Sequence, residues 1–196
     1  MKGMDIMFQT APGVTIPFPD KILEEYQIFK GESICANVSY EKLLALITDF
    51  YRALPEPLFL VMQLPLSIDE ENKMGFEEIL HQEVLYLDGQ TQSQIDTIMT
   101  SYGQLLLSDG LSQFAIASHK SHEEIFIQKY KVVSIYSEIP ERYAVLLTKY
   151  GLHKTDQLIT AWDTFSQDYP GECRRICIDG LDTYDVADIL KKQGMY

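Results

Sequence analysis

The densest group of potential metal ligands and acid–base groups lies in the sequence between residues 119 and 124. His119, His122 and Glu123 fall within a few positions of one another. On an exposed loop, two imidazoles and a carboxylate could converge on a divalent metal ion or serve as acid and base. The spacing is not that of the helical HExxH site, and a polar loop of this composition is also expected for solubility. The group defines one hypothesis, a small-molecule or metal-dependent enzyme.

The cysteines form the second candidate group. The alternation in residues 173–178 predicts a strand, on which Cys173 and Cys177 share a face. Their sulfurs would then lie about 13 Å apart, too far for one zinc ion or a disulfide. A structural role is therefore favoured over a catalytic pairing of Cys177 with His122 or His153. A total of three cysteines is too few and odd for a disulfide framework, which favours a reducing compartment and hence the cytoplasm.

Aspartates at positions 179, 182, 185 and 188 recur every third residue, but this spacing lacks the mid-loop glycine and terminal glutamate of a calcium loop. Acidic residues are favourable at a helix N-terminus in any case. Gly-rich nucleotide-binding motifs and a GxSxG nucleophile motif are also missing from the sequence. The sequence therefore predicts no cofactor.

The distribution of charge suggests a kind of partner. The formal net charge is -13 at pH 7, and residues 1–100 hold 6 Lys/Arg against 16 Asp/Glu. Such a surface repels nucleic acid and anionic lipid and speeds encounter with a cationic protein, although solubility alone also explains it. We expect the binding face in the acidic stretch that contains Asp69, Glu70, Glu71, Glu77, Glu78 and Glu83.

Trp162 is the single tryptophan of the chain. A lone tryptophan is more often a core residue than an exposed one. If Trp162 were exposed beside Asp163 and Asp168, it would make a binding anchor with an acidic rim, because tryptophan is enriched among interface hot spots.

These residues must be positioned by a mixture of helices and strands. Apolar periodicity and capping signals predict helices near residues 39–54, 91–108, 140–150 and 182–190. Short apolar or β-branched runs predict strands at 58–64, 84–87, 114–117, 125–127, 132–136 and 173–178, three of them in an antiparallel meander. Residues 158–165 fit neither pattern clearly. We expect a single α+β domain over residues 1–196, with residues 1–20 a Pro-rich N-terminal arm, and no signal peptide or membrane span.

Four stretches carry a resemblance: YLDGQT at 86–91, LLLSDGLSQFAIASH at 105–119, KYKVVSIYS at 129–137 and AWDTFS at 161–166. From Tyr86 onward the chain resembles small uncharacterised bacterial cytosolic proteins, some of which are similar to immunity proteins of polymorphic toxin systems. The resemblance implies a non-enzymatic inhibitor whose surface blocks one toxin. It rests on turn and core residues and transfers no functional residue.

Together these features predict a non-enzymatic acidic binding protein, an immunity-type inhibitor of a basic protein partner. The first alternative is the enzyme that uses the loop of His119 and His122. A second alternative is a homo-oligomeric structural or regulatory module, because the apolar run at residues 58–64 could lie at an interface instead of in a core.

Overall fold

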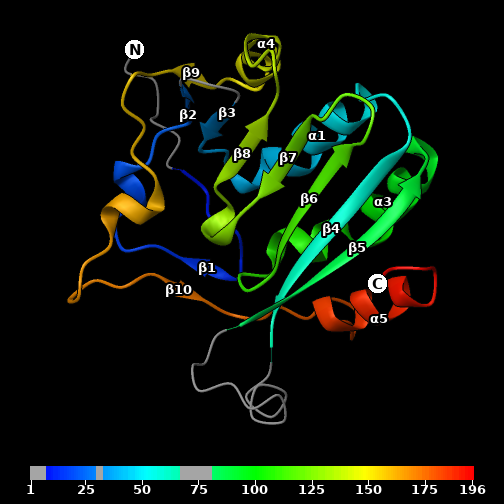
Figure 1. The fold of residues 1–196 in the computed structure, drawn as a ribbon. Helices are drawn as coiled ribbons and strands as arrows, with labels where there is room; N and C mark the ends of the chain where they lie inside the picture. The colour runs from blue at the N-terminus through cyan, green and yellow to red at the C-terminus, as the bar shows by residue number, and fades with distance from the viewer. Residues whose placement is uncertain (1–7, 30–32, 67–80) are drawn as a thin grey trace.

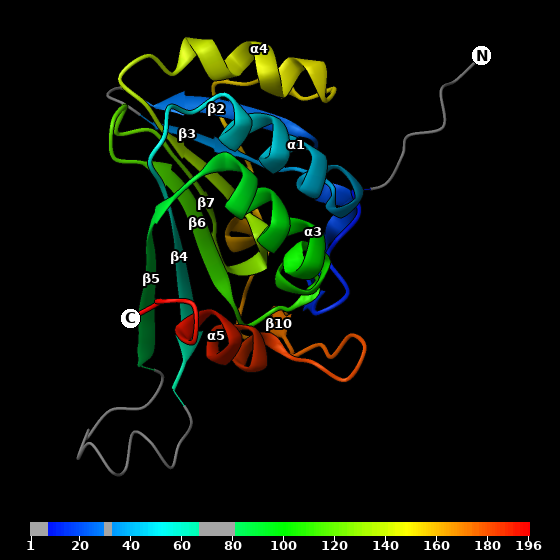
Figure 2. The same ribbon diagram turned by 90° about the vertical axis from the view of Figure 1, so that its right-hand side faces the viewer.

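The computed structural model describes residues 8–29, 33–66 and 81–196. Helices cover one face of a mixed eight-stranded sheet, and a small two-stranded sheet lies beside it (Figures 1 and 2). The order in the large sheet is β5-β4-β6-β7-β8-β3-β2-β9, and every neighbouring pair is antiparallel except β2 and β9. The expected α+β fold, with helices packed on a mixed and largely antiparallel sheet, is confirmed.

The strands of the large sheet are β2 (Glu25–Phe29), β3 (Ser33–Ala36), β4 (Leu58–Pro65), β5 (Gln82–Gln90), β6 (Gln113–Ser118), β7 (Glu124–Ile127), β8 (Val133–Tyr136) and β9 (His153–Lys154). Strands β6, β7 and β8 form the expected antiparallel meander. The sequence patterns predicted neither β2 nor β3, which are short and mix polar with apolar residues. They extend the sheet beyond the meander through the pairing of β3 with β8.

The described helices are α1 (Tyr40–Arg52), α3 (Gln92–Ser108), α4 (Glu141–Lys149) and α5 (Thr183–Lys191). Helices α1 and α3 lie side by side against the sheet, α4 lies toward its β2 end and α5 near β4 (Figure 2). All four helices lie where apolar periodicity and capping signals predicted them. The capping box that was expected at Thr91 and Gln94 begins α3, and Asp182 caps α5.

One continuous core fills the space between the helices and the sheet. Alternate strand residues such as Leu60 of β4, Ile116 of β6 and Ile135 of β8 point into it and are fully buried. Phe50 of α1 and Leu106 of α3 meet them from the helical side. Burial of these side chains is the main stabilising contribution to the fold, since each removes apolar surface from water.

The described part of the Pro-rich arm is bound to the domain at Gly13. Strand β1 (Val14–Thr15) pairs with β10 (Glu172–Cys173), and the arm's Val14 and Ile16 enter a second, smaller core. Gly13 donates its N–H to the Ser108 carbonyl at 2.8 Å, and the Arg174 N–H donates to the Gly13 carbonyl at 2.9 Å. A Cβ on Gly13 would meet backbone atoms at 2.4–2.7 Å, so this junction requires glycine.

Two sequence expectations are corrected. The strand expected at residues 173–178 ends at Cys173, because the next backbone groups bond elsewhere: the Ile176 N–H donates to the Asp109 carboxylate at 3.0 Å. The cysteines therefore do not share a strand face. The strand expected at residues 84–87 does not stop before Asp88-Gly89; β5 continues to Gln90 through a register shift, where Gly89 has a φ of 68°. Residues 158–165, which fitted neither pattern, contain a 3-10 turn, η3 (Ala161–Thr164).

Candidate functional site: the uncovered face of the sheet

On the second face of the sheet, no helix of the described residues lies over β4 to β8, so the side chains of these strands form a surface (Figures 1 and 2). Along each strand the residues that alternate with the core positions point to this face. The nearly continuous apolar run at residues 58–64 is typical of a strand buried on both faces, but here it covers the core on one side only. Tyr86 and Tyr136 remain 42% and 43% exposed here.

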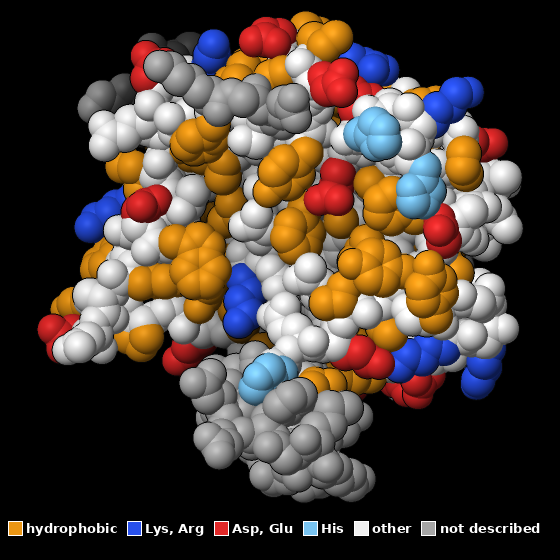
Figure 3. Space-filling view, in the orientation of Figure 1, with side chains coloured by type: hydrophobic (Ala, Val, Ile, Leu, Met, Phe, Trp, Pro, Cys, Tyr) orange, Lys and Arg blue, Asp and Glu red, His pale blue; other side chains and the backbone are white. Residues whose placement is uncertain are grey.

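The strand register fixes which side chains are neighbours on this face. One row crosses five strands in the order Tyr86, Val61, Ala115, Phe126 and Ser134. The next row runs from Phe59 through Ala117 and Glu124 to Tyr136. Hydrophobic side chains gather over the sheet in Figure 3, with isolated acidic side chains among them. We call these two rows, together with Asp88 of β5 beside Phe59, the open face.

The remaining part of this side of the sheet is covered by the chain itself. Gln27 of β2 donates its side-chain N–H to the Asp156 carbonyl at 2.9 Å and accepts from the Leu158 N–H at 3.0 Å. Asn37 donates to the Ile159 carbonyl at 2.8 Å. The segment after β9 therefore crosses β2 and β3, and the open face is confined to the larger strands.

Glu124 is the carboxylate at the centre of the open face. It stands opposite Ala117 on one side and Tyr136 on the other. Desolvation raises the pKa of its carboxyl group above the ordinary value. Within the described part of the chain its side chain has no hydrogen bond or ion pair, so no internal cation offsets this desolvation.

Asp88 is the second carboxylate of the open face, and it is already paired. His119 Nε2 lies 2.6 Å from Asp88 Oδ1, and the imidazole stacks on Phe59 with the ring centroids 4.4 Å apart. This bond lowers the pKa of the Asp88 carboxyl group. Over β4 to β8, the described strand positions of this face carry Asp88 and Glu124 and no lysine or arginine.

Two of the three proposed metal ligands are held by other side chains. His119 pairs with Asp88, and Glu123, which is only 6% exposed, accepts hydrogen bonds from Ser137 Oγ at 3.1 Å and Arg142 Nη1 at 3.3 Å. His122 and Glu123 line a hollow of about 340 Å³ with Arg142, but His119 does not. Throughout residues 8–29, 33–66 and 81–196, no group of three or more His, Cys, Asp or Glu side chains could hold a metal ion.

The residues of the predicted acidic face divide into two groups. Glu83 lies on β5, where its carboxylate pairs with Lys191 Nζ of α5 at 3.1 Å. It therefore belongs to the helical side of the sheet rather than to the open face. Asp69, Glu70, Glu71, Glu77 and Glu78 lie outside the described residues.

Trp162 is 49% exposed, so it is not a core residue. Its ring packs edge-on against Tyr130 with centroids 4.7 Å apart, and Tyr130 lies in η2 (Lys129–Lys131), the turn that joins β7 to β8. Asp163 is exposed beside it, and its carboxylate accepts from the Thr160 N–H at 2.8 Å in a capping box. Asp168 is exposed.

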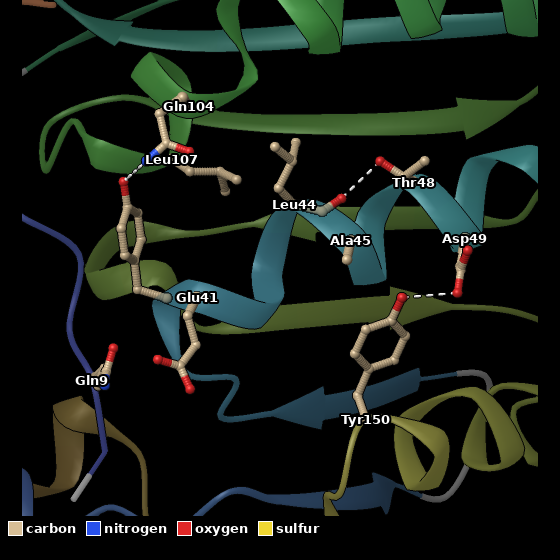
Figure 4. Close-up of a pocket in the computed structure, with 10 residues that line it drawn as sticks. Gln9, Glu41, Leu44, Ala45, Thr48, Asp49, Gln104, Leu107 and Tyr150 are labelled. Carbon is tan, nitrogen blue, oxygen red and sulfur yellow. Dashed lines mark hydrogen bonds between the residues drawn. The ribbon is translucent and has the colours of Figure 1, made fainter.

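A second hollow, of about 670 Å³, lies on the helical side between α1, α3 and the residue that follows α4 (Figure 4). Its polar groups largely bond to one another. Tyr150 donates to Asp49 at 2.8 Å, and Gln104 donates to the Tyr40 hydroxyl. These bonds leave few free groups to recognise a ligand, and no nucleophile and base are paired among the residues that line it.

Comparison of the chain with protein-family models, with curated proteins and with solved structures found no match. Within the part of the chain that the structure describes, no helix combines the length and the apolar character needed to cross a membrane. Local sequence signals did not reveal the open face, because each of its strands contributes only two or three residues to it. The alternation of Phe59, Val61 and Gln63 with core leucines is the one signal that could have indicated it.

Proposed function

We propose that this chain is a non-enzymatic binding protein whose open face docks a basic protein partner. The observation that carries the proposal is the bare sheet surface, on which aromatic side chains surround Glu124 and no lysine or arginine is present at the described strand positions over β4 to β8. Exposed aromatic groups supply binding energy, and unpaired carboxylates select a cationic partner.

The charge of the whole chain supports the same partner. A net charge of -13 accelerates encounter with a cationic surface and disfavours nucleic acid. It also disfavours a homo-oligomer, because equally acidic copies repel one another. With the resemblance to immunity proteins, these features favour an inhibitor that blocks one toxin, and the three cysteines favour action in a bacterial cytoplasm.

The test begins with affinity capture from a bacterial lysate, after which each captured protein is purified and its Kd is measured. The variants Tyr86→Ala and Tyr136→Ala remove exposed parts of the open face, and Val145→Ala on the solvent side of α4 is the matched control. We expect a partner of positive net charge, an affinity at least about tenfold lower for each tyrosine variant, and a loss below about twofold for the control. Association should slow as the salt concentration rises.

Two results would overturn the proposal. One is that no captured protein depends on Tyr86 or Tyr136. The other is that light scattering finds a dimer that Tyr136→Ala dissociates, because the open face would then bind a second copy of the chain.

A further inference from the structure

A hollow of about 310 Å³ lies at the centre of the open face. Strand β6 contributes only Ala115 and Ala117 to this face, whereas β4 contributes Phe59 and β7 contributes Phe126. Since neighbouring strands are about 4.8 Å apart, the side chains of β4 and β7 face each other across a gap of about 9.6 Å. Ala115 forms the floor of this gap. The volume of the hollow is at the small end of the range for ligand pockets.

The walls of the hollow are aromatic, and one wall carries the unpaired carboxylate. Phe59, Tyr86 and Phe126 line it together with Glu124 and Gln63. The faces of aromatic rings attract cations, most strongly where water is partly excluded. The hollow therefore combines apolar walls for an aliphatic stem, rings for a flat cation and one negative charge.

We propose that this hollow receives an arginine side chain of the partner, whose guanidinium pairs with Glu124. Arginine suits it better than lysine. The guanidinium is planar, stacks on aromatic rings, is less strongly hydrated than an ammonium group and can donate two parallel hydrogen bonds to a carboxylate. Desolvation of Glu124 without an internal cation, which raises the pKa of its carboxyl group, is the electrostatic cost that such a partner offsets.

This inference rests on the proposed docking of a basic protein, and it adds the chemistry of the central contact. It also assigns roles. Glu124 is the charge-recognition residue, and Ala115 is the residue whose small size opens the hollow. A larger side chain at position 115 should fill the space on the open face without entering the core, because Ala115 points away from the helices.

The probe is a blocked Gly-Arg-Gly peptide, compared with the same peptide containing citrulline, a neutral relative of arginine, and with Gly-Lys-Gly. Binding is followed by NMR through the methyl signals of Ala115 and Val61. We expect saturable shifts with the arginine peptide, at least about threefold weaker binding of the lysine peptide and no saturation with citrulline.

Glu124→Gln and Ala115→Ile should each weaken binding of the arginine peptide at least about tenfold. Glu138→Gln, which lies outside the hollow, is the matched control and should change it less than about twofold.

The outcomes separate this inference from the proposed function. Equal binding of the arginine and citrulline peptides, or an unchanged affinity in Glu124→Gln, overturns the arginine site. If the captured partner still loses affinity with Tyr86→Ala, docking on the open face survives that failure. If the peptide binds as expected but the partner's affinity is unchanged in Tyr86→Ala and Tyr136→Ala, the proposed function is wrong. The hollow would then remain a site for isolated arginine side chains. Circular dichroism of each variant reports whether it is folded.

Discussion

The Lys131 Nζ donates a hydrogen bond of 3.1 Å to the carbonyl oxygen of Leu106, in the last turn of α3. The same ammonium group donates to the Ser112 carbonyl at 3.1 Å, and the lysine is buried. Carbonyls in the last turn of a helix lack intrahelical partners and attract cations. Lys131, in the turn between β7 and β8, therefore caps the C-terminal end of α3 with its side chain. Its backbone has a positive φ of 58°.

Replacement of this lysine should destabilise the protein strongly. In Lys131→Met the two buried carbonyls lose their donor, and the buried Asp109 carboxylate loses the nearby positive charge of Lys131. We expect a loss of about 2–4 kcal/mol in the free energy of unfolding, measured by urea denaturation. The exposed Lys120→Met should change it by less than about 0.5 kcal/mol. Equal effects of the two variants would contradict the role of Lys131.

The stability of the protein should also depend on pH through Lys131. Burial lowers the pKa of this ammonium group from 10.5 to about 8. Between these values the unfolded chain binds more protons than the folded chain, so this group's contribution makes stability rise with pH. The rise should approach about 1.4 kcal/mol per pH unit above pH 8. Below pH 8 the full cost of the buried charge is present.

The difference between wild type and Lys131→Met isolates this effect. Burial raises the pKa of the Cys35 thiol, which opposes the rise from about pH 9 in both proteins. Burial also raises the pKa of the Cys173 thiol, and Lys131 lowers it, so this thiol opposes the rise more strongly in the variant and widens the gap further. The stability gap between wild type and variant should therefore widen from pH 7 to pH 9.5 in urea titrations. A gap that stays constant over this range would show that Lys131 keeps an ordinary pKa.

Trp162 provides a fluorescence test of the surface beside the open face. Because the ring is 49% exposed, acrylamide should quench its emission readily in the folded protein. Trp162→Ala should cost about 1 kcal/mol, well below the cost of truncating a buried tryptophan, because the main lost contact is with Tyr130. A loss above about 3 kcal/mol, or poor quenching, would contradict the half-exposed position.

The enzyme alternative makes a separate prediction about metals. Since His119 pairs with Asp88 and Glu123 with Arg142, we expect no stabilising shift in Tm when Zn²⁺ or Mn²⁺ is added to protein treated with a chelator. Any shift should be the same in His122→Ala as in wild type. A Tm increase that His122→Ala abolishes would instead support metal binding at the loop.

The sequence alone predicted the elements whose signals are local. The helix that begins after Thr91 carries its own capping box, and the meander from Phe114 to Tyr136 pairs strands that follow one another in the chain. Hydrophobic periodicity and turns act over a few residues, so these features need no knowledge of distant segments. The acidic balance of the chain also follows from composition.

The tertiary structure decided what depends on contacts between distant residues. It places β4 between β5 and β6, and thereby sets Phe59 and Phe126 on opposite sides of Ala115. It also pairs Glu123 with Arg142, exposes Trp162 and ends the strand expected at residues 173–178. The hydrophobic pattern of each strand is compatible with many strand orders. The order that forms depends on which packing buries the core, so no single segment of the sequence determines the hollow around Glu124.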